Sequence, residues 1–259
     1  MAETTESWDK VAHDYQRTYN LGINEYNAEL LCFLEHSRMI FPGCKVIDIG
    51  CGVGKYGTYL AALGCDVTLT DISERMLKFA EENMAQFGTP WRTFCCDFSS
   101  VTGDEPVFRD GFDFSMSTMS PAICDVDSVK KMSAMTHGWC FVARFSSWSQ
   151  PQRDALLREL GVEPSAPFAN LSGDCASIIE AVSAAGYVPM VKYVDYNWLD
   201  QRTPEQTADF ILNRCFDADS AKPEYAAVLD AAKRLCGEDG LFEDEVLTKA
   251  AWIYWRTAN

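Results

Sequence analysis

The segment around residues 46–55 places one carboxylate next to three closely spaced glycines, a combination suited to binding a charged small molecule. It reads Val46-Ile-Asp48-Ile-Gly50-Cys51-Gly52-Val-Gly54-Lys55. Glycine adopts left-handed backbone angles and leaves no Cβ to obstruct a ligand that approaches the main chain. If a helix begins just after the last glycine, its free N–H groups offer donors to a phosphate or a carboxylate.

Two kinds of cofactor suit such a turn. A nicotinamide or flavin dinucleotide is bound by G-x-G-x-x-G directly after a strand. Counted from Gly50, the third glycine falls on Lys55; counted from Gly52, the pattern matches through Gly57 but begins two residues late. Asp48 favours a cationic ligand, because a carboxylate repels a pyrophosphate and attracts an ammonium or a sulfonium. We therefore expect S-adenosylmethionine, which carries both cations, with a nicotinamide dinucleotide as the alternative.

The elements around this turn alternate between strand and helix patterns. Short buried-type strands are predicted at 45–49, 66–70, 91–96, 112–116 and 138–145, and helices at 55–63, 73–87 and 127–135. Strands separated by helices of this length indicate βαβ units and a parallel sheet covered on both faces.

The flanking segments complete the predicted fold. Helices are expected at 7–19 and 24–35 before the sheet; after it come helices at 152–160, 176–185, 204–215 and 223–236 and strands at 188–194 and 250–255. We predict an α/β fold: a doubly wound, mostly parallel seven-stranded sheet with N-terminal helices and a helical insertion between the last two strands. The expected organisation is one domain, 1–259. It has an N-terminal helical cap (1–40), a cofactor-binding core (41–147) and a C-terminal part (148–259) with a substrate cap at about 200–240.

These residues resemble the Rossmann-like, class I methyltransferases that depend on S-adenosylmethionine. The first motif of that family, acid-x-G-x-G-x-G, is met by Asp48 and the three glycines that follow it. The family's second acid, at the end of strand two, corresponds to Asp71, and its third polar position, after strand three, to Asp97. The resemblance covers about residues 40–145.

The resemblance implies roles for single residues. Asp71 would accept the ribose hydroxyls, Asp97 the adenine amino group, and Phe98 or Ile72 would sandwich the ring. The cofactor-binding residues expected in this way are Tyr15, Asp48, Gly50, Cys51, Gly52, Gly54, Asp71, Ile72, Met76, Asp97, Phe98 and Ser117. His13, on the N-terminal helix, is the candidate general base, and Met119 and Trp148 are candidates for the acceptor pocket. Structural alternatives stay open: a helix cap for Asp71, a turn for Asp97, and packing for Cys51, His13, Tyr15 and Trp148.

Composition limits the partners. Asp and Glu number 38 against 22 Lys and Arg, a formal charge of −16 that repels phosphate backbones, so we expect no nucleic-acid partner. No window approaches 18 consecutive apolar residues, and the chain starts acidic and polar, so we expect no membrane segment and a cytoplasmic protein. Eleven cysteines without a C-x-x-C and three histidines favour buried thiols over a metal site.

The expected function is methyl transfer to an oxygen, nitrogen or sulfur nucleophile of a small molecule. The segment Met119-Ser-Pro-Ala122 departs from the Asn/Asp-Pro-Pro-aromatic motif of relatives that methylate bases or glutamine. Asp125 and Asp127 are expected to cap the next helix and not to bind a metal. Alternatives are a non-catalytic S-adenosylmethionine-binding module, and a methyltransferase for a metalloid or thiol or for a protein. The sequence specifies neither the acceptor nor the oligomeric state.

Overall fold

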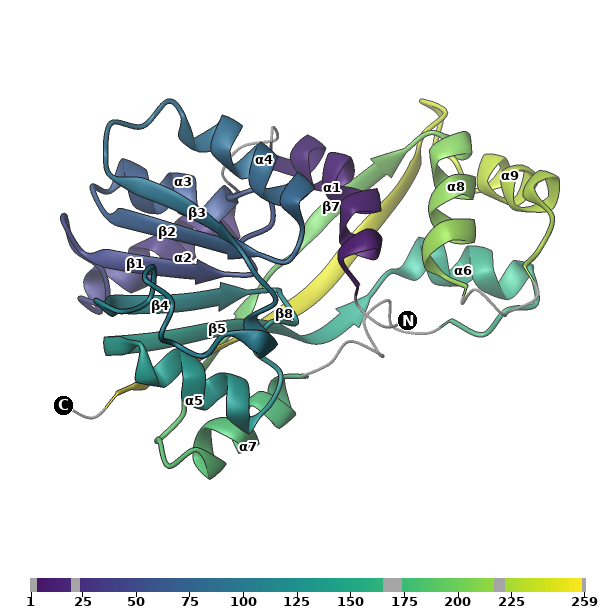
Figure 1. Ribbon diagram of the computed structural model, residues 1–259. Helices are drawn as coiled ribbons and strands as arrows, with labels where there is room; N and C mark the ends of the chain where they lie inside the picture. The colour runs from purple at the N-terminus through teal and green to yellow at the C-terminus, as the bar shows by residue number, and fades with distance from the viewer. Residues whose placement is uncertain (1–3, 20–23, 165–173, 217–221, 258–259) are drawn as a thin grey trace. The chain divides into compact units, whose positions relative to one another are not determined.

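Parallel strands buried on both faces form the centre of the fold. The computed structural model describes residues 4–19, 24–164, 174–216 and 222–257 (Figure 1). Strands β1 (Lys45–Ile49), β2 (Asp66–Asp71), β3 (Trp91–Cys95), β4 (Phe112–Thr118) and β5 (Thr136–Ser149) pair in parallel. With β6 (Met190–Asp195) and β8 (Phe242–Arg256) the order is β3-β2-β1-β4-β5-β8-β6, and β7 (Trp198–Arg202) pairs with β8. The predicted mostly parallel α/β sheet is confirmed.

Within the described residues the sheet has eight strands where seven were predicted, because β7 was missed. It follows β6 after a two-residue gap and pairs antiparallel with the first half of β8, from Trp198↔Val246 to Arg202↔Phe242. Strands β5 and β8 are also longer than expected. Along β8, Phe242, Asp244, Val246 and Thr248 are buried while the residues between them are exposed, the two-residue period of a strand with one buried face.

The chain divides into two compact units. The first, here called the sheet unit, comprises 2–144, 172–194 and 251–259. Its helices are α1 (Thr5–Tyr19), α2 (Glu25–His36), α3 (Lys55–Ala62), α4 (Glu74–Met84), α5 (Val126–Ala134) and α7 (Cys175–Ala184), with a 3₁₀ turn at Phe98–Ser100. Asn24, Ser73, Asp125 and Asp174 cap helices by accepting the backbone N–H of the residue three positions further on.

The second, here called the helical unit, comprises 145–171 and 195–250. It holds α6 (Pro151–Glu159), α8 (Pro204–Arg214) and α9 (Tyr225–Arg234). Buried apolar residues of these helices pack on one another and on Phe242. The Asp244 carboxylate accepts hydrogen bonds from the backbone N–H groups of Gln152 and Arg153, both at 3.0 Å, which ties the start of α6 to β8. No helix in the described residues is long and apolar enough to cross a membrane.

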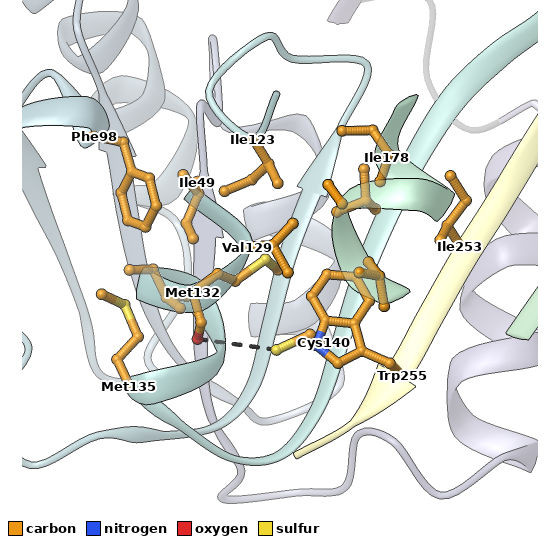
Figure 2. Packing of buried hydrophobic residues seen from close by; sticks show 14 of the residues in the cluster. Ile49, Phe98, Ile123, Val129, Met132, Met135, Cys140, Ile178, Ile253 and Trp255 are labelled. Atoms are coloured by element: carbon orange, nitrogen blue, oxygen red, sulfur yellow. Dashed lines mark hydrogen bonds between the residues drawn. The ribbon is translucent and has the colours of Figure 1, made fainter. Parts of the chain in front are cut away.

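Alternate residues at the end of β8 show that both faces of the sheet are covered. Trp252 and Tyr254 contact Phe33 of α2, with ring centroids 5.1 and 5.3 Å apart. Ile253 and Trp255 point to the other face, into the apolar cluster formed with α5 and α7 (Figure 2). The indole N–H of Trp255 donates to the Ser133 hydroxyl at 2.9 Å, so this fully buried ring has its one polar group paired.

Replacing Trp255 by alanine should therefore lower the free energy of unfolding by about 3–5 kcal/mol, through lost burial and the cavity left behind. Denaturant unfolding measures the change. Trp255→Phe is the matched control, since it retains most of the apolar volume and should lose less than half as much. Equal losses in the two variants would contradict the packing role of the ring.

Candidate functional site

The glycine turn joins β1 to α3 and is fixed to the end of β2. The N–H groups of Gly50 and Cys51 both donate to the Thr70 carbonyl, at 2.8 and 2.9 Å. Gly50, Gly52 and Gly54 have φ of 70°, 55° and 76°, in the left-handed region that favours glycine. The turn thus lies at the carboxyl ends of β1 and β2, the edge at which open α/β sheets bind ligands.

The three glycines differ in what surrounds them. A Cβ on Gly50 would lie 1.9 Å from the Ser120 hydroxyl, and one on Gly54 would lie 3.0 Å from the Ala80 Cβ, so both positions are closed by protein. A Cβ on Gly52 would meet nothing within 4 Å. The main chain at Gly52 therefore borders open space, as required where a ligand approaches the backbone.

Asp71, the last residue of β2, holds this turn with its carboxylate. One oxygen accepts from the Gly52 N–H at 2.8 Å and the other from the Ser73 N–H at 2.9 Å. Burial raises the pKa of Asp71, and the Asp9 carboxylate adds to this, while the bonds from Ser73 and Gly52 oppose it. The cap of α4 is Ser73, so Asp71 is not the helix cap considered as its structural alternative.

Asp48 is the most unusual group in the site. Its side chain is fully buried in β1, and neither carboxylate oxygen has a hydrogen-bond partner within the described residues. Burial raises the pKa of Asp48 to about 7, and repulsion from Asp71 adds to the shift. A buried carboxylate without a partner costs several kcal/mol when charged, a cost that a bound cation would offset.

Helix α1 packs against α4 and the glycine turn. The amides of Gln16 and Asn83 bond reciprocally at 2.9 Å, and Asn83 also donates to the Val53 carbonyl at 2.9 Å. The Ser73 hydroxyl donates to the Asp9 carboxylate, which brings a third acid close to Asp71. Asp9 was not predicted. No pattern within α1 marks it, because its partner Ser73 lies 64 residues away.

The predicted residues near the turn have mixed surroundings. Cys51 is buried, and burial together with Asp71 and Asp48 raises its thiol pKa, so it is a neutral, small group. Met76 lies in an apolar cluster with Ala12 of α1. Ser117 is fully buried in β4, and its hydroxyl donates to the Ile49 carbonyl at 2.9 Å.

The residues predicted to contact adenine have different surroundings in the structure. Asp97 is exposed and caps the 3₁₀ turn, its carboxylate accepting from the Ser99 N–H at 2.9 Å. Phe98 is only 4% exposed and lies in the core cluster with Ile49 (Figure 2). Ile72, after β2, is half-buried. Since Phe98 is occupied by core packing, Ile72 is the better placed of the two to contact an adenine ring.

His13 and Tyr15 are both exposed on α1. The His13 ring packs edge-on against Phe79 of α4 with centroids 5.1 Å apart, and the Tyr15 ring does the same against Trp8 at 6.3 Å. Both contacts are compatible with simple packing, so the roles predicted for the two side chains remain predictions.

The acceptor candidates lie in different units. Met119, just past β4 in the sheet unit, is half-buried with φ of 50°, an uncommon angle for a residue with a side chain, and its N–H donates to the Ala143 carbonyl at 3.0 Å. Trp148 belongs to the helical unit, where its ring packs on Phe145 and Trp198 at 5.0 and 5.2 Å between centroids. Asp125 caps α5, as expected. Across the described ranges no three His, Cys, Asp or Glu side chains group as metal ligands.

The two faces of the turn can be tested with glycine variants. Gly52→Ala should fold with a loss of about 1–2 kcal/mol from the left-handed angle and should weaken cofactor binding, because its methyl group enters the open space. Gly50→Ala should be far more destabilising, since its methyl group collides with Ser120. Thermal unfolding and ligand titration separate the effects, and Gly50→Ala/Ser120→Gly should recover part of the stability. A Gly52→Ala variant with unchanged affinity would show that the ligand does not pass Gly52.

Asp48 should leave a signature in stability. Its pKa of about 7 in the folded protein exceeds the ordinary 3.8, so the folded state retains a proton that the unfolded chain releases. The free energy of unfolding should consequently fall as pH rises from about 4 to 7. Asp48→Asn removes this term and should exceed the wild type at pH 8 by up to about 4 kcal/mol, at about 1.36 kcal/mol per pKa unit. Denaturant titrations at several pH values measure it; equal slopes in both proteins would contradict the assignment.

Comparison with known proteins agrees with this geometry. A family model described as a methyltransferase domain matches residues 46–139. The ubiquinone biosynthesis O-methyltransferase of Chromobacterium violaceum is 27% identical over 144 residues, 54% of this chain and 60% of that protein. The ribosomal RNA small subunit methyltransferase C of Alcanivorax borkumensis is 34% identical over 97 residues, 37% of this chain and 30% of that protein. The chain thus spans 60% or less of these relatives.

A solved structure extends the likeness beyond the matched segment. The YcgJ protein from Bacillus subtilis superposes with a TM-score of 0.54 at 12% identity, covering 88% of this chain and 98% of that one, which shows a shared fold. Residues 46–139 match a methyltransferase domain, and the chain shares its Rossmann-like α/β fold with the YcgJ protein.

Proposed function

We propose that this protein transfers the methyl group of S-adenosylmethionine to an oxygen, nitrogen or sulfur nucleophile of a small molecule. The observation that carries the proposal is the Asp48 carboxylate, buried and without a partner in the described chain, directly before a turn that is open at Gly52. This group needs a cation, and S-adenosylmethionine brings an ammonium and a sulfonium.

The charge around the turn also separates this cofactor from a dinucleotide. Asp71 is close enough to Asp48 to raise its pKa, and Asp9 lies close enough to Asp71 to raise the pKa of that carboxyl. Three acids would repel a pyrophosphate, whereas they suit a ligand that combines a cation with ribose hydroxyls. In this proposal the second lone pairs of the Asp71 carboxylate, beyond those used by Gly52 and Ser73, accept the ribose hydroxyls.

The chemistry asks little of the protein beyond alignment. The bound sulfonium supplies an activated methyl group for in-line displacement. The chain has to hold the acceptor in line and exclude water, an effect worth up to about 7–11 kcal/mol in favourable cases. We propose that the segment after β4 that contains Met119 lines the acceptor pocket. His13 would act as general base where the acceptor is a hydroxyl.

The proposal of a small-molecule acceptor rests on the net charge of the chain. One relative methylates ribosomal RNA by its name, which makes RNA the competing class. A net charge of −16 opposes that class, because RNA binding depends on neutralising phosphates with basic side chains. All eleven cysteines are free, which suits a reducing compartment, and we propose a cytoplasmic location on this basis.

The test begins with calorimetric titration of S-adenosylmethionine and S-adenosylhomocysteine. We expect both to bind at micromolar levels, and NAD not to bind. Asp48→Asn should bind at least tenfold more weakly while remaining folded, since a charged hydrogen bond contributes about 1.5–3 kcal/mol. Thr68→Val, at a buried position of the neighbouring strand β2, is the matched control and should retain affinity.

Turnover is then measured with labelled S-adenosylmethionine and a panel of thiols, amines, phenols and bulk RNA. Transfer to a small molecule supports the proposal. Binding without transfer to any acceptor would instead indicate a non-catalytic cofactor-binding module, and transfer to RNA would overturn the small-molecule assignment. Tight NAD binding with none of S-adenosylmethionine would overturn the proposal as a whole.

A further inference from the structure

A cavity lies in the sheet unit at the edge opposite the glycine turn. It has a volume of about 180 Å³ and is lined by Arg38, Met39, Phe41, Asp113, His137, Gly138, Trp139 and Arg256. These residues come from the link between α2 and β1, the start of β4, the start of β5 and the end of β8. Figure 1 shows β8 running out beside the start of β5. The cavity is therefore at the amino ends of β4 and β5, remote from the ends at which the cofactor site lies.

Hydrogen bonds join the strand ends at this edge of the sheet. The Thr257 N–H and hydroxyl both bond to the Gly138 carbonyl, at 3.0 and 3.1 Å, which fixes the end of β8 on the start of β5. The Asp113 carboxylate accepts from the Lys45 N–H at 2.9 Å and so joins β4 to β1. The lining is thus built on paired strand ends.

Two arginines contribute positive charge to the lining of the cavity. Within the part of the chain that the structure describes, neither Arg38 nor Arg256 has a hydrogen bond or an ion pair through its guanidinium. Arg256 lies over the Trp139 ring, 5.9 Å from its centroid. His137 adds a third nitrogen-bearing side chain, its ring nitrogen 3.4 Å from the Asp110 carbonyl. Two unpaired guanidinium groups at one cavity stand out in a chain of net charge −16.

Arg38 also occupies a position suited to glycine. It follows the end of α2 with φ of 53°, where its N–H bonds to the Glu35 carbonyl and that of Met39 to the Leu34 carbonyl, at 2.9 and 3.0 Å. This Schellman arrangement places a left-handed residue at the position that Arg38 fills, most often glycine. The left-handed backbone angle is unfavourable for arginine and favourable for glycine. Replacing Arg38 by glycine should therefore leave the fold intact.

We propose that this cavity binds a small phosphate-bearing molecule with an apolar or aromatic part. Guanidinium groups bind phosphate through paired N–H donors, and two of them match its charge. Asp113 opposes the anion, but one of its oxygens is turned to the Lys45 N–H. The exposed Phe41 ring, with Met39 and Trp139, offers an apolar wall for the rest of the ligand. The volume suits a group smaller than a whole cofactor.

The experiment uses the full chain saturated with S-adenosylhomocysteine, so that the probe cannot enter the cofactor site. Adenosine monophosphate and inorganic phosphate are titrated by calorimetry at constant ionic strength. We expect saturable binding of both, with the nucleotide tighter because its base contacts the apolar wall. Should S-adenosylhomocysteine itself fail to bind, the same titrations without it still decide this proposal, since the two sites share no residue.

Three variants make the result specific. Arg38→Gly should weaken phosphate and nucleotide binding about tenfold to hundredfold through the lost charged hydrogen bonds while its melting temperature is equal or higher. Arg158→Ala removes the same charge from an exposed position of α6 and should bind like the wild type. Asp113→Asn should bind more tightly, because the opposing charge is gone while an amide oxygen can still accept from Lys45.

Absence of binding by both probes, or affinities that the Arg38 and Asp113 variants leave unchanged, would overturn the proposal. Equal affinities for phosphate and the nucleotide would show that the apolar residues do not contribute to binding. That result would overturn the proposed ligand.

Discussion

A carboxylate buried without a partner is the constraint on which the cofactor site depends. Asp48 lies inside β1, where the strands on both sides supply only backbone pairing, and no described side chain bonds to its oxygens. Such a group weakens the ligand-free fold, because charging it in an apolar core is costly. Asp48 lies directly before the glycine turn. A cation bound at the turn would offset that cost.

The rest of the site leaves open space beside the turn that follows this carboxylate, at Gly52. Gly50 and Gly54 bring Ser120 and α4 close to the turn, while Gly52 faces open space. Asp71 fixes the Gly52 N–H, and α1 is held over α4 by the Gln16–Asn83 pair. In the function proposed above, the affinity for a cationic cofactor comes from preorganised acids, and reaction requires only that an acceptor be held in line with the methyl group.

Features encoded by neighbouring residues were predicted from the sequence, and features that depend on residues far apart in the chain were missed. The glycine turn and the strands before and after it were predicted because spacing and burial patterns are local. Asp9 was missed because its partner Ser73 is 64 residues away, and no pattern within α1 marks it. Strand β7 was missed because its sequence alternates weakly and because it pairs with residues of β8 that lie 40 to 48 positions further on. Phe98 or Ile72 was expected to contact the adenine ring, and this remains a prediction; no local pattern indicated that the Phe98 ring lies in the core cluster.

The central claim, that Asp48 receives the cation of the cofactor, is tested most directly by counting protons. With a pKa of about 7, roughly half of the Asp48 carboxyls are protonated at pH 7 and must ionise on binding. Calorimetric titration of S-adenosylmethionine in buffers of different ionisation enthalpy gives the number of protons released. The account predicts that the wild type releases about half a proton more than Asp48→Asn at pH 7, and that the difference vanishes near pH 9. Equal proton counts for the two proteins at both pH values would contradict it.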